Sequence, residues 1–250
     1  MWNTSIGWRM TNPKLRKEWT ISNGESAEGL ARRYGVTRNE QDEFALRSHR
    51  LADAAWTSGV LDHEIVRVPG VELDRDENIR GNASFERLAS LPALFAENGT
   101  VTAGNSSSIN DGAVALILGT ADAVDREPLA RISGRGVSGN DPDVFGIAPV
   151  EAANRALNRA GRTWAEVDLF ELNEAFSAQS LACLRELPDL DPAIVNIHGG
   201  AIAIGHPLGA SGGRILGHAA HELRRRGHGI AVVAICIGVG QALAVVLERD

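Results

Sequence analysis

The segment from Asn196 to Gly213 constrains the fold of this chain more than any other stretch. Seven of its eighteen residues are glycine or proline. Glycine allows positive φ angles and close backbone approach, whereas proline fixes φ. The sequence therefore predicts a shaped loop with His206 at its bend. From Ser211 onward the pattern is helical and ends in three arginines before Gly227, which predicts that the loop leads into a helix.

Two other segments place polar groups at the ends of predicted strands. The apolar, β-branched run 229–235 ends at Cys236 and is followed by the turn residues Gly238 and Gly240. This pattern predicts a buried strand that delivers a thiol to a turn whose backbone N–H groups can face a ligand. The segment 169–177 is a second strand that runs into a helix, with an Asn–Glu pair at the junction.

Taken together, these three segments resemble the thiolase family. They match its three C-terminal catalytic motifs in order along the chain: Asn173–Glu174–Ala175–Phe176, Gly205–His206–Pro207-x-Gly209-x-Ser211–Gly212 and Cys236-x-Gly238-x-Gly240. The resemblance covers essentially all 250 residues but corresponds only to the later part of a thiolase. The stretch Thr4–Arg9 looks most like the thiolases that act on β-ketoadipyl-CoA.

The resemblance implies a role for each motif residue. Cys236 matches the cysteine that takes or returns the α-proton, a task that suits a thiol because its pKa of about 8.5 can be shifted by neighbours. His206 matches the histidine that activates the acyl nucleophile and, with a water held by Asn173, stabilises the enolate oxygen. The Gly238 N–H matches half of the second oxyanion hole. The nucleophile itself belongs to the first half of the family fold.

The resemblance also implies contacts with coenzyme A, which is a substrate and not a permanently bound cofactor. Arg80 matches a residue that contacts the nucleotide end, although the residues alone equally allow an arginine paired with Asp76 or Glu77. Ser107 matches a serine that contacts pantetheine, with a simple helix-cap cluster as the alternative.

Two positions depart from the family pattern. Asn23 replaces a common methionine before Gly24, which removes an apolar contact to the acyl or pantetheine region, and Ser108 replaces a usual glycine, which reshapes the turn after Ser107.

The order of the predicted elements indicates an α/β protein with a mostly parallel sheet and helices on its faces. The resemblance implies a thiolase-like fold with one complete βαβαβαββ core half plus a loop domain that covers the coenzyme. We expect the loop domain over 1–107, the tail of the first core half over 108–127 and the C-terminal domain over 128–250.

The expected strands are 64–68, 129–135, 167–172, 194–196, 230–235 and 242–248. The expected helices are two over 25–58, the second opened by the capping box Thr37-x-x-Glu40, then 84–89, 150–160, 175–187 and the one that starts near Ser211; 113–118 is either a helix or a strand.

Several polar residues have a simpler interpretation. His49 is predicted to be a solvated helix residue, and a helix surface is predicted to expose His218 and His221, with His228 beyond it. Cys183 is predicted to lie in the core, Glu174 is compatible with a structural role that ties loop backbones together, and Cys236 could be an inert buried thiol. No metal site is expected, because the spacing of His198, His206 and Cys236 fits no zinc pattern.

Composition excludes several classes of protein. The chain is 44% apolar and 23% charged, which is ordinary for a globular protein. No run of 18 apolar residues is present and the start lacks a secretory pattern, so neither a membrane span nor a signal peptide is expected. Two cysteines do not make a disulfide framework, which favours the cytoplasm. The net charge of −7 argues against nucleic acid as a partner, but it leaves room for an anionic ligand held by local arginines.

The expected function is acyl transfer on coenzyme A thioesters, either thiolysis of a 3-ketoacyl-CoA such as β-ketoadipyl-CoA or the reverse condensation of acetyl-CoA. The alternatives are a non-catalytic CoA-binding or interaction module and one half of a split thiolase. Since the nucleophile is absent from these residues, we expect a truncated thiolase that is inactive alone. The full-length family suggests a homo-oligomer, with a separate N-terminal half as another partner. Apolar side chains of 114–118 are then expected to be exposed.

Overall fold

The computed structural model describes residues 11–123 and 126–250. Trp2, Trp8 and the stretch Thr4–Arg9 lie outside the described residues. The sheet has the order β1-β4-β3-β2 and consists of β1 (Arg131–Gly139), β2 (Leu169–Leu172), β3 (Gly229–Ile237) and β4 (Gln241–Arg249). β2 pairs parallel with β3, whereas β4 pairs antiparallel with both β1 and β3. Three of these strands therefore run in one direction, and the predicted closing hairpin inserts β4 between two of them.

The strand predicted over 194–196 is wrong. Residues Pro192–Ile194 form a short 3-10 helix, and Val195 makes a single parallel bridge to Phe170. Asn196 then turns away with a φ of 45°. Its side chain accepts a hydrogen bond from Leu172 N and donates one to Leu172 O, both within 2.9 Å, in place of a strand ladder. The third strand of the expected core half is thus reduced to one bridge.

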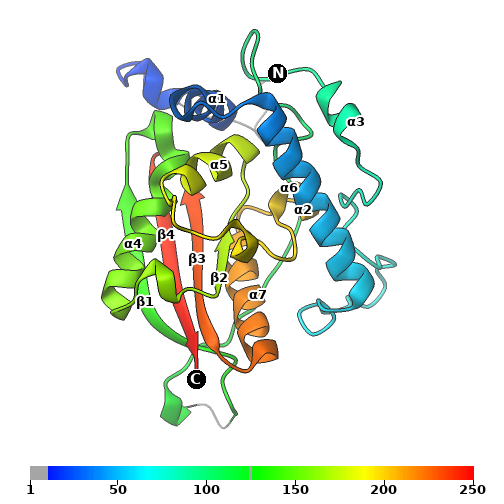
Figure 1. Ribbon diagram of the computed structural model, residues 1–250, viewed down its shortest axis with the longest axis vertical. Coiled ribbons are helices and arrows are strands. Elements are labelled where there is room, and N and C mark those ends of the chain that lie inside the picture. Colours follow the sequence, from blue (N-terminus) through cyan, green and yellow to red (C-terminus); the bar gives the residue numbers. More distant parts are fainter. Residues whose placement is uncertain (1–10, 124–125) are drawn as a thin grey trace.

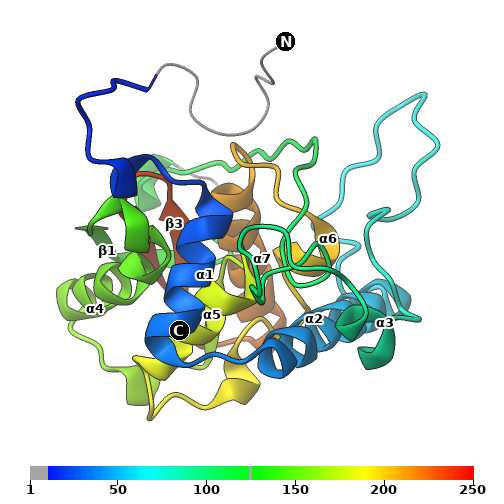
Figure 2. The same cartoon turned by 90° about the horizontal axis from the view of Figure 1, so that it is seen from above.

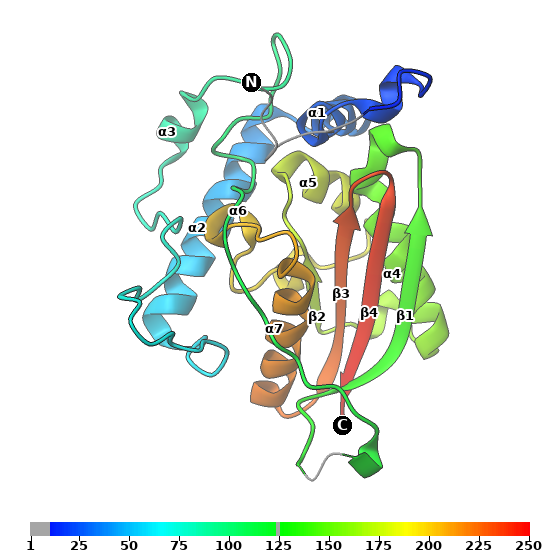
Figure 3. The same ribbon diagram turned by 180° about the vertical axis from the view of Figure 1, so that it is seen from behind.

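Helices cover the two faces of the sheet (Figures 1 and 3). α4 (Ala148–Ala160) and α5 (Ser177–Arg185) pack on one face, and α7 (Ser211–Arg226) packs on the other. α4 lies so close to β1 that a Cβ at Gly136 would sit 1.8 Å from the carbonyl oxygen of Ala152. Left-handed glycines at the ends of α4 and α7 stop both helices where the sequence predicted.

The N-terminal part is helical and flanks the sheet domain, as seen from above in Figure 2. Capping boxes open both α1 (Asn23–Tyr34) and α2 (Arg38–Ser58), which confirms the prediction at Thr37. Short helices follow at α3 (Phe85–Ala89) and α6 (Ala201–Ile204), and 3-10 helices are formed by Lys17–Thr20, Ala121–Ala123, Pro142–Ile147 and Trp164–Glu166. Of the helices in the described residues, none has the length and apolar character needed to cross a membrane.

The strand predicted over 64–68 does not form. This segment is irregular, and the side chains of Val66 and Val68 are 85% and 60% exposed. β-branched residues favour a strand only where neighbouring side chains and a partner backbone are present. Within the described part of the chain no strand lies beside this segment, so its backbone has no partner with which to form a sheet.

Residues 108–120 form neither a helix nor a strand but run in an extended path over α7 (Figure 3). The segment can pass this close to α7 because Gly213 has no side chain: a Cβ there would lie 2.6 Å from the Val114 side chain. The expected exposure of this segment is confirmed. Val114 and Leu116 are 43% and 40% exposed, and Ile117 and Leu118 reach 94% and 70%.

Candidate active site

The loop before α7 has the shaped backbone that its glycines predicted. Gly205 ends α6 with a φ of 94°, and a Cβ there would lie 2.2 Å from Oδ1 of Asn110. Glycine is therefore needed for both its backbone angle and its lack of a side chain. The next residue, His206, donates its backbone N–H to the carbonyl of Ser108 at 2.9 Å. The loop thus holds the 105–110 turn directly beside the histidine.

The two imidazole nitrogens of His206 have different partners. Nε2 lies 3.3 Å from Nδ2 of Asn173, and Nδ1 lies 2.6 Å from Oγ of Ser211. The Ser211 hydroxyl is also 3.1 Å from the carbonyl of Pro207. If Ser211 donates to Pro207, then Nδ1 carries the proton of the imidazole; if it donates to Nδ1, then Nε2 carries that proton. The sequence placed Ser211 in the motif of His206 and at the start of a helix, but it assigned the hydroxyl no role; in the structure that hydroxyl sets the tautomer.

Burial, reinforced by the positive charge of Arg214, lowers the pKa of His206 to about 4. Both causes disfavour the imidazolium. His206 is consequently neutral at physiological pH, which is the state required of a base or of a neutral hydrogen-bond donor.

Cys236 lies at the end of β3 and is 7% exposed. Its thiol packs in a small cluster with Phe145 and Ala175, and burial raises its pKa to about 12. It makes no hydrogen bond to His206 or Asn173 within the described residues. The thiol is therefore protonated at neutral pH in this unliganded state.

The turn after Cys236 is tightly constrained. Val239 and Gly240 both have positive φ angles, 68° and 86°, and a Cβ at Gly240 would meet the carbonyl oxygen of Asn140 at 2.0 Å. This places Gly238 at the tip of the hairpin between β3 and β4, half-buried. The role of its N–H in an oxyanion hole stays a prediction.

Glu174 ties three segments together beneath the site. Its carboxylate accepts hydrogen bonds from Ser48 Oγ at 2.6 Å, Asn196 Nδ2 at 2.8 Å and Ile202 N at 3.2 Å. The side chain is fully buried, and burial raises its pKa. A Cβ at Gly200 would lie 2.3 Å from the carboxyl carbon, so glycine makes room for this contact. The contacts fit the structural role considered from the sequence.

A second polar cluster lies on the inner side of α7, and here the prediction of a solvated surface is wrong for His218. His218 is only 6% exposed. Its Nδ1 is 2.9 Å from the Glu64 carboxylate, and its Nε2 is 3.1 Å from Nδ1 of His198 and 3.8 Å from Glu171. Burial raises the pKa of Glu171 to about 7. His221 is half-buried and His228 is exposed.

The spacing along α7 contained the signal for His218. It follows Ile215 by three residues and precedes Ala219 and Glu222 on the same helix face, all of which are buried. A polar residue within an apolar helical stripe needs a buried partner. Glu64 lies 154 residues away in sequence, so only the folded structure identifies it.

The prediction for His49 is also wrong. His49 is 5% exposed, because it lies on the buried face of α2 between Ala45 and Ala52. Its Nδ1 accepts a hydrogen bond from the backbone N–H of Arg80 at 3.3 Å. Burial, with a smaller contribution from Arg80, lowers the pKa of His49.

His49 borders a cavity of about 300 Å³ between α2, α3 and the 103–108 turn. The remaining lining residues are Asn78, Arg80, Asn82, Ala83, Ser84, Arg87, Leu88, Leu91, Ala103, Gly104, Ser106, Ser108 and Ile202. Arg80 is thus on this cavity, and no ion pair joins it to Asp76 or Glu77 in the described chain. Ser107 is not among the lining residues. Its Oγ donates to the carbonyl of Ala175 at 2.9 Å, so it joins the turn to the Asn173–Phe176 motif.

Comparison with known proteins gives consistent matches. A family model described as "Thiolase, N-terminal domain" matches residues 11–122, and one described as "Thiolase, C-terminal domain" matches residues 126–249. The chain is 46% identical to the 3-oxoadipyl-CoA/3-oxo-5,6-dehydrosuberyl-CoA thiolase of Escherichia coli K12, over all of this chain and 65% of that protein. It is 43% identical to the β-ketoadipyl-CoA thiolase of Pseudomonas putida, over 99% of this chain and 64% of that one.

Solved structures agree with these matches. The structure of human mitochondrial 3-ketoacyl-CoA thiolase in complex with CoA superposes with a TM-score of 0.90 at 41% identity, covering 99% of this chain and 66% of that one. The acetyl-CoA acetyltransferase of Bacillus anthracis superposes with a TM-score of 0.85 at 38% identity, over 100% and 68%. This chain spans about 65% of the length of the Escherichia coli relative.

Proposed function

Because this chain belongs to the thiolase family, we propose that it carries the proton-transfer part of an acyltransferase site for coenzyme A thioesters. The observation that carries the proposal is the approach of Asn173 Nδ2 to His206 Nε2 at 3.3 Å. These side chains come from two of the three motifs, and the third motif begins with a buried thiol. The motifs thus supply two hydrogen-bonding side chains and a buried thiol, which are the groups that enolate chemistry needs.

The proposed substrate is a 3-ketoacyl-CoA, since relatives in Escherichia coli and Pseudomonas putida are named for 3-oxoadipyl-CoA and β-ketoadipyl-CoA. In thiolysis an acyl acceptor, which is neither Cys183 nor Cys236, bonds to the β-carbonyl carbon and keeps the acyl group. The bond between the α- and β-carbons breaks, and its electron pair leaves with the acetyl-CoA enolate. The Cys236 thiol gives its proton to the α-carbon of that enolate. Its raised pKa keeps it protonated and ready for this step. In condensation the same thiolate takes the proton back.

The developing enolate oxygen needs hydrogen-bond donors. We propose that His206 supplies one through Nε2–H, in the tautomer in which Ser211 donates to Nδ1, together with a water held by Asn173. This tautomer requires the Asn173 amide to turn its oxygen, which has no hydrogen-bond partner among the described residues, toward Nε2 in place of Nδ2. The Gly238 N–H is proposed to serve a second oxyanion, next to the acyl acceptor. Loss of one such donor costs about 10²–10³ in rate in other enzymes.

Neither cysteine of the chain has the environment of an acyl acceptor. Cys183 is fully buried in α5, where its thiol donates to the carbonyl of Gly146 at 3.2 Å. The Cys236 thiol has a strongly raised pKa, and residues 11–123 and 126–250 place no base within hydrogen-bond distance of it. A thiol nucleophile requires the opposite, a lowered pKa or an adjacent base. We therefore expect the acyl group to be carried elsewhere than on these two side chains.

Coenzyme binding tests the proposal. We expect Arg80→Ala to weaken binding of CoA about tenfold (~1.4 kcal/mol) through loss of a cation near phosphate. Ser107→Ala should weaken it a few-fold, because the hydroxyl fixes the turn against Ala175. Titration calorimetry of the folded chain measures both, with Arg33→Ala on the exposed end of α1 as the charge-matched control. Wild-type affinity in the Arg80 and Ser107 variants would contradict this assignment.

A further inference from the structure

The cavity between α2, α3 and the 103–108 turn has an unusual charge for this chain. Its lining contains two arginines, Arg80 and Arg87, and no aspartate or glutamate, although the chain carries a net charge of −7. Both arginines use their backbone N–H groups locally, with His49 and Ser84. Within the described residues neither guanidinium forms an ion pair or hydrogen bond. Two unpaired guanidinium groups on one cavity favour an anionic ligand.

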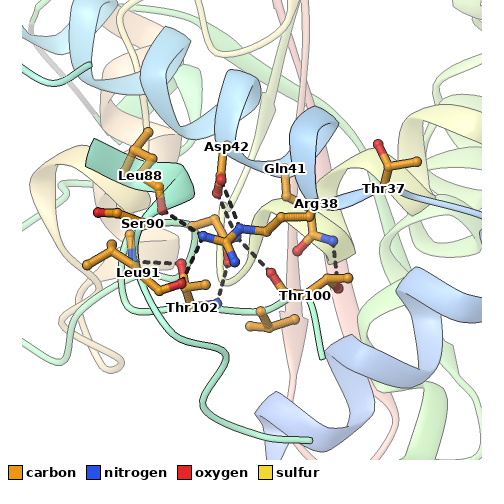
Figure 4. A network of polar contacts seen from close by, with 12 residues as sticks. Thr37, Arg38, Gln41, Asp42, Leu88, Ser90, Leu91, Thr100 and Thr102 are labelled. Atoms are coloured by element: carbon orange, nitrogen blue, oxygen red, sulfur yellow. Dashed lines mark hydrogen bonds and ion pairs between the residues drawn. The ribbon is translucent and has the colours of Figure 1, made fainter. Parts of the chain in front are cut away.

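The backbone that carries Arg87 is firmly held. The guanidinium of Arg38 donates to the carbonyl of Leu88 at 2.6 Å and to that of Leu91 at 3.1 Å, which fixes the end of α3 against α2 (Figure 4). Arg38 is fixed in turn by Asp42 at 2.8 Å, whose side chain is fully buried. Because the backbone of α3 does not need to be ordered on binding, only the Arg87 side chain itself has to be immobilised.

The opposite wall of the cavity is held by a hydrogen bond to the same aspartate, Asp42. Asp42 Oδ1 accepts a hydrogen bond from Asn105 Nδ2 at 2.9 Å, and Asn105 precedes the turn that lines the cavity. One buried carboxylate thus sets the separation of α3 from this turn. The cavity is a built feature of the fold and not a gap between mobile loops.

One end of the cavity lies beside His206. Its turn end adjoins the active site, since the carbonyl of Ser108 accepts from the backbone N–H of His206 at 2.9 Å. Its lining also includes the apolar side chains of Leu88, Leu91 and Ile202. A coenzyme A thioester placed with its reacting end beside His206 would therefore direct its phosphate-bearing end toward the arginines.

On the basis of the proposed function, we propose that Arg87 is a phosphate-binding residue that makes this chain prefer CoA over its phosphate-free pantetheine arm. Arg80 was expected at the nucleotide end from sequence, whereas Arg87 is identified only by the shared cavity. A guanidinium offers paired N–H donors that match phosphate oxygens, and this match is lost with a neutral side chain. The pantetheine arm contacts only the apolar and turn residues, so its binding does not depend on Arg87.

The test compares Arg87→Gln with wild type for two ligands at fixed ionic strength. We expect the variant to bind CoA about tenfold more weakly by calorimetry, while its affinity for pantetheine, measured by ligand-observed NMR at millimolar concentration, changes less than twofold. Arg33→Gln removes the same charge from an exposed site outside the cavity and should change neither affinity more than twofold. Added salt should weaken CoA binding less in the Arg87 variant than in wild type.

The possible outcomes separate the inference from the proposed function. Unchanged CoA affinity in Arg87→Gln, or equal weakening of both ligands, overturns the role of Arg87 but leaves the site of acyl transfer standing. Equal loss in Arg33→Gln shows a general charge effect and also overturns it. If folded wild-type chain binds neither CoA nor pantetheine, the proposed function fails together with the inference.

Discussion

Cys236→Ser and His206→Ala should each slow the exchange of the acetyl protons of acetyl-CoA with D₂O at least a hundredfold. Serine is too weak an acid to share the α-proton as a thiol does, and alanine removes the donor to the enolate oxygen. General acid–base and oxyanion groups each contribute about 10²–10⁴ in comparable enzymes. Exchange is followed by the loss of the methyl signal in proton NMR, with the folded chain and saturating acetyl-CoA.

The control for this prediction is Cys183→Ser, which makes the same change in a buried cysteine of α5 and should leave exchange within about twofold of wild type.

The pH dependence of the exchange rate adds an independent check. Because the pKa of His206 is lowered to about 4, its protonation should not reduce the rate between pH 6.5 and 5. Because the pKa of Cys236 is raised to about 12, exchange should accelerate through the neutral range as thiolate becomes more abundant. Wild-type rates in both variants would make the site assignment wrong.

Glu174→Ala should reduce the free energy of unfolding by about 3–5 kcal/mol. The substitution leaves three donors, Ser48 Oγ, Asn196 Nδ2 and Ile202 N, without their common acceptor in a buried setting. Gly200→Ala provides a second variant, since its new Cβ would overlap the carboxylate. Urea denaturation followed by circular dichroism measures both.

An exposed glutamate on α2 supplies the control for Glu174. Glu43→Ala removes a carboxylate that is exposed to solvent, and it should change the free energy of unfolding by no more than about 0.5 kcal/mol. A loss below about 1 kcal/mol in Glu174→Ala would contradict the structural role, because the three segments would then be held by other contacts. The comparison separates the buried network from a general effect of charge.

Local chemistry made part of this structure predictable. The capping box at Thr37 and the glycine stops at Gly161 and Gly227 act within a few residues, so sequence alone locates those helix ends. The loop around His206 was predictable for the same reason, since its glycines and proline limit the backbone directly. The structure brings two of the motif side chains, Asn173 and His206, within 3.3 Å of each other, whereas the roles that the resemblance implies for them and for Cys236 stay predictions.

What sequence could not supply were partners distant along the chain. His49 and His218 are buried by contacts with Arg80 and Glu64, which lie 31 and 154 residues away along the chain, so their burial depends on contacts that no local pattern reveals. The strand expected at 194–196 failed because the side chain of Asn196 bonds to the backbone of Leu172 in place of a ladder. The exposed segment 114–118 was anticipated only through the family resemblance.

The central claim is that Cys236 moves a proton and does not accept an acyl group. The most direct test is to incubate the purified 250-residue chain with acetyl-CoA and to measure its intact mass together with the release of free CoA. We expect an unchanged protein mass and no CoA released above the background hydrolysis rate, because the Cys236 thiol is protonated and none of the described residues places a base beside it. Stoichiometric acetylation of the chain with turnover of CoA would contradict the account and would make Cys236 the nucleophile.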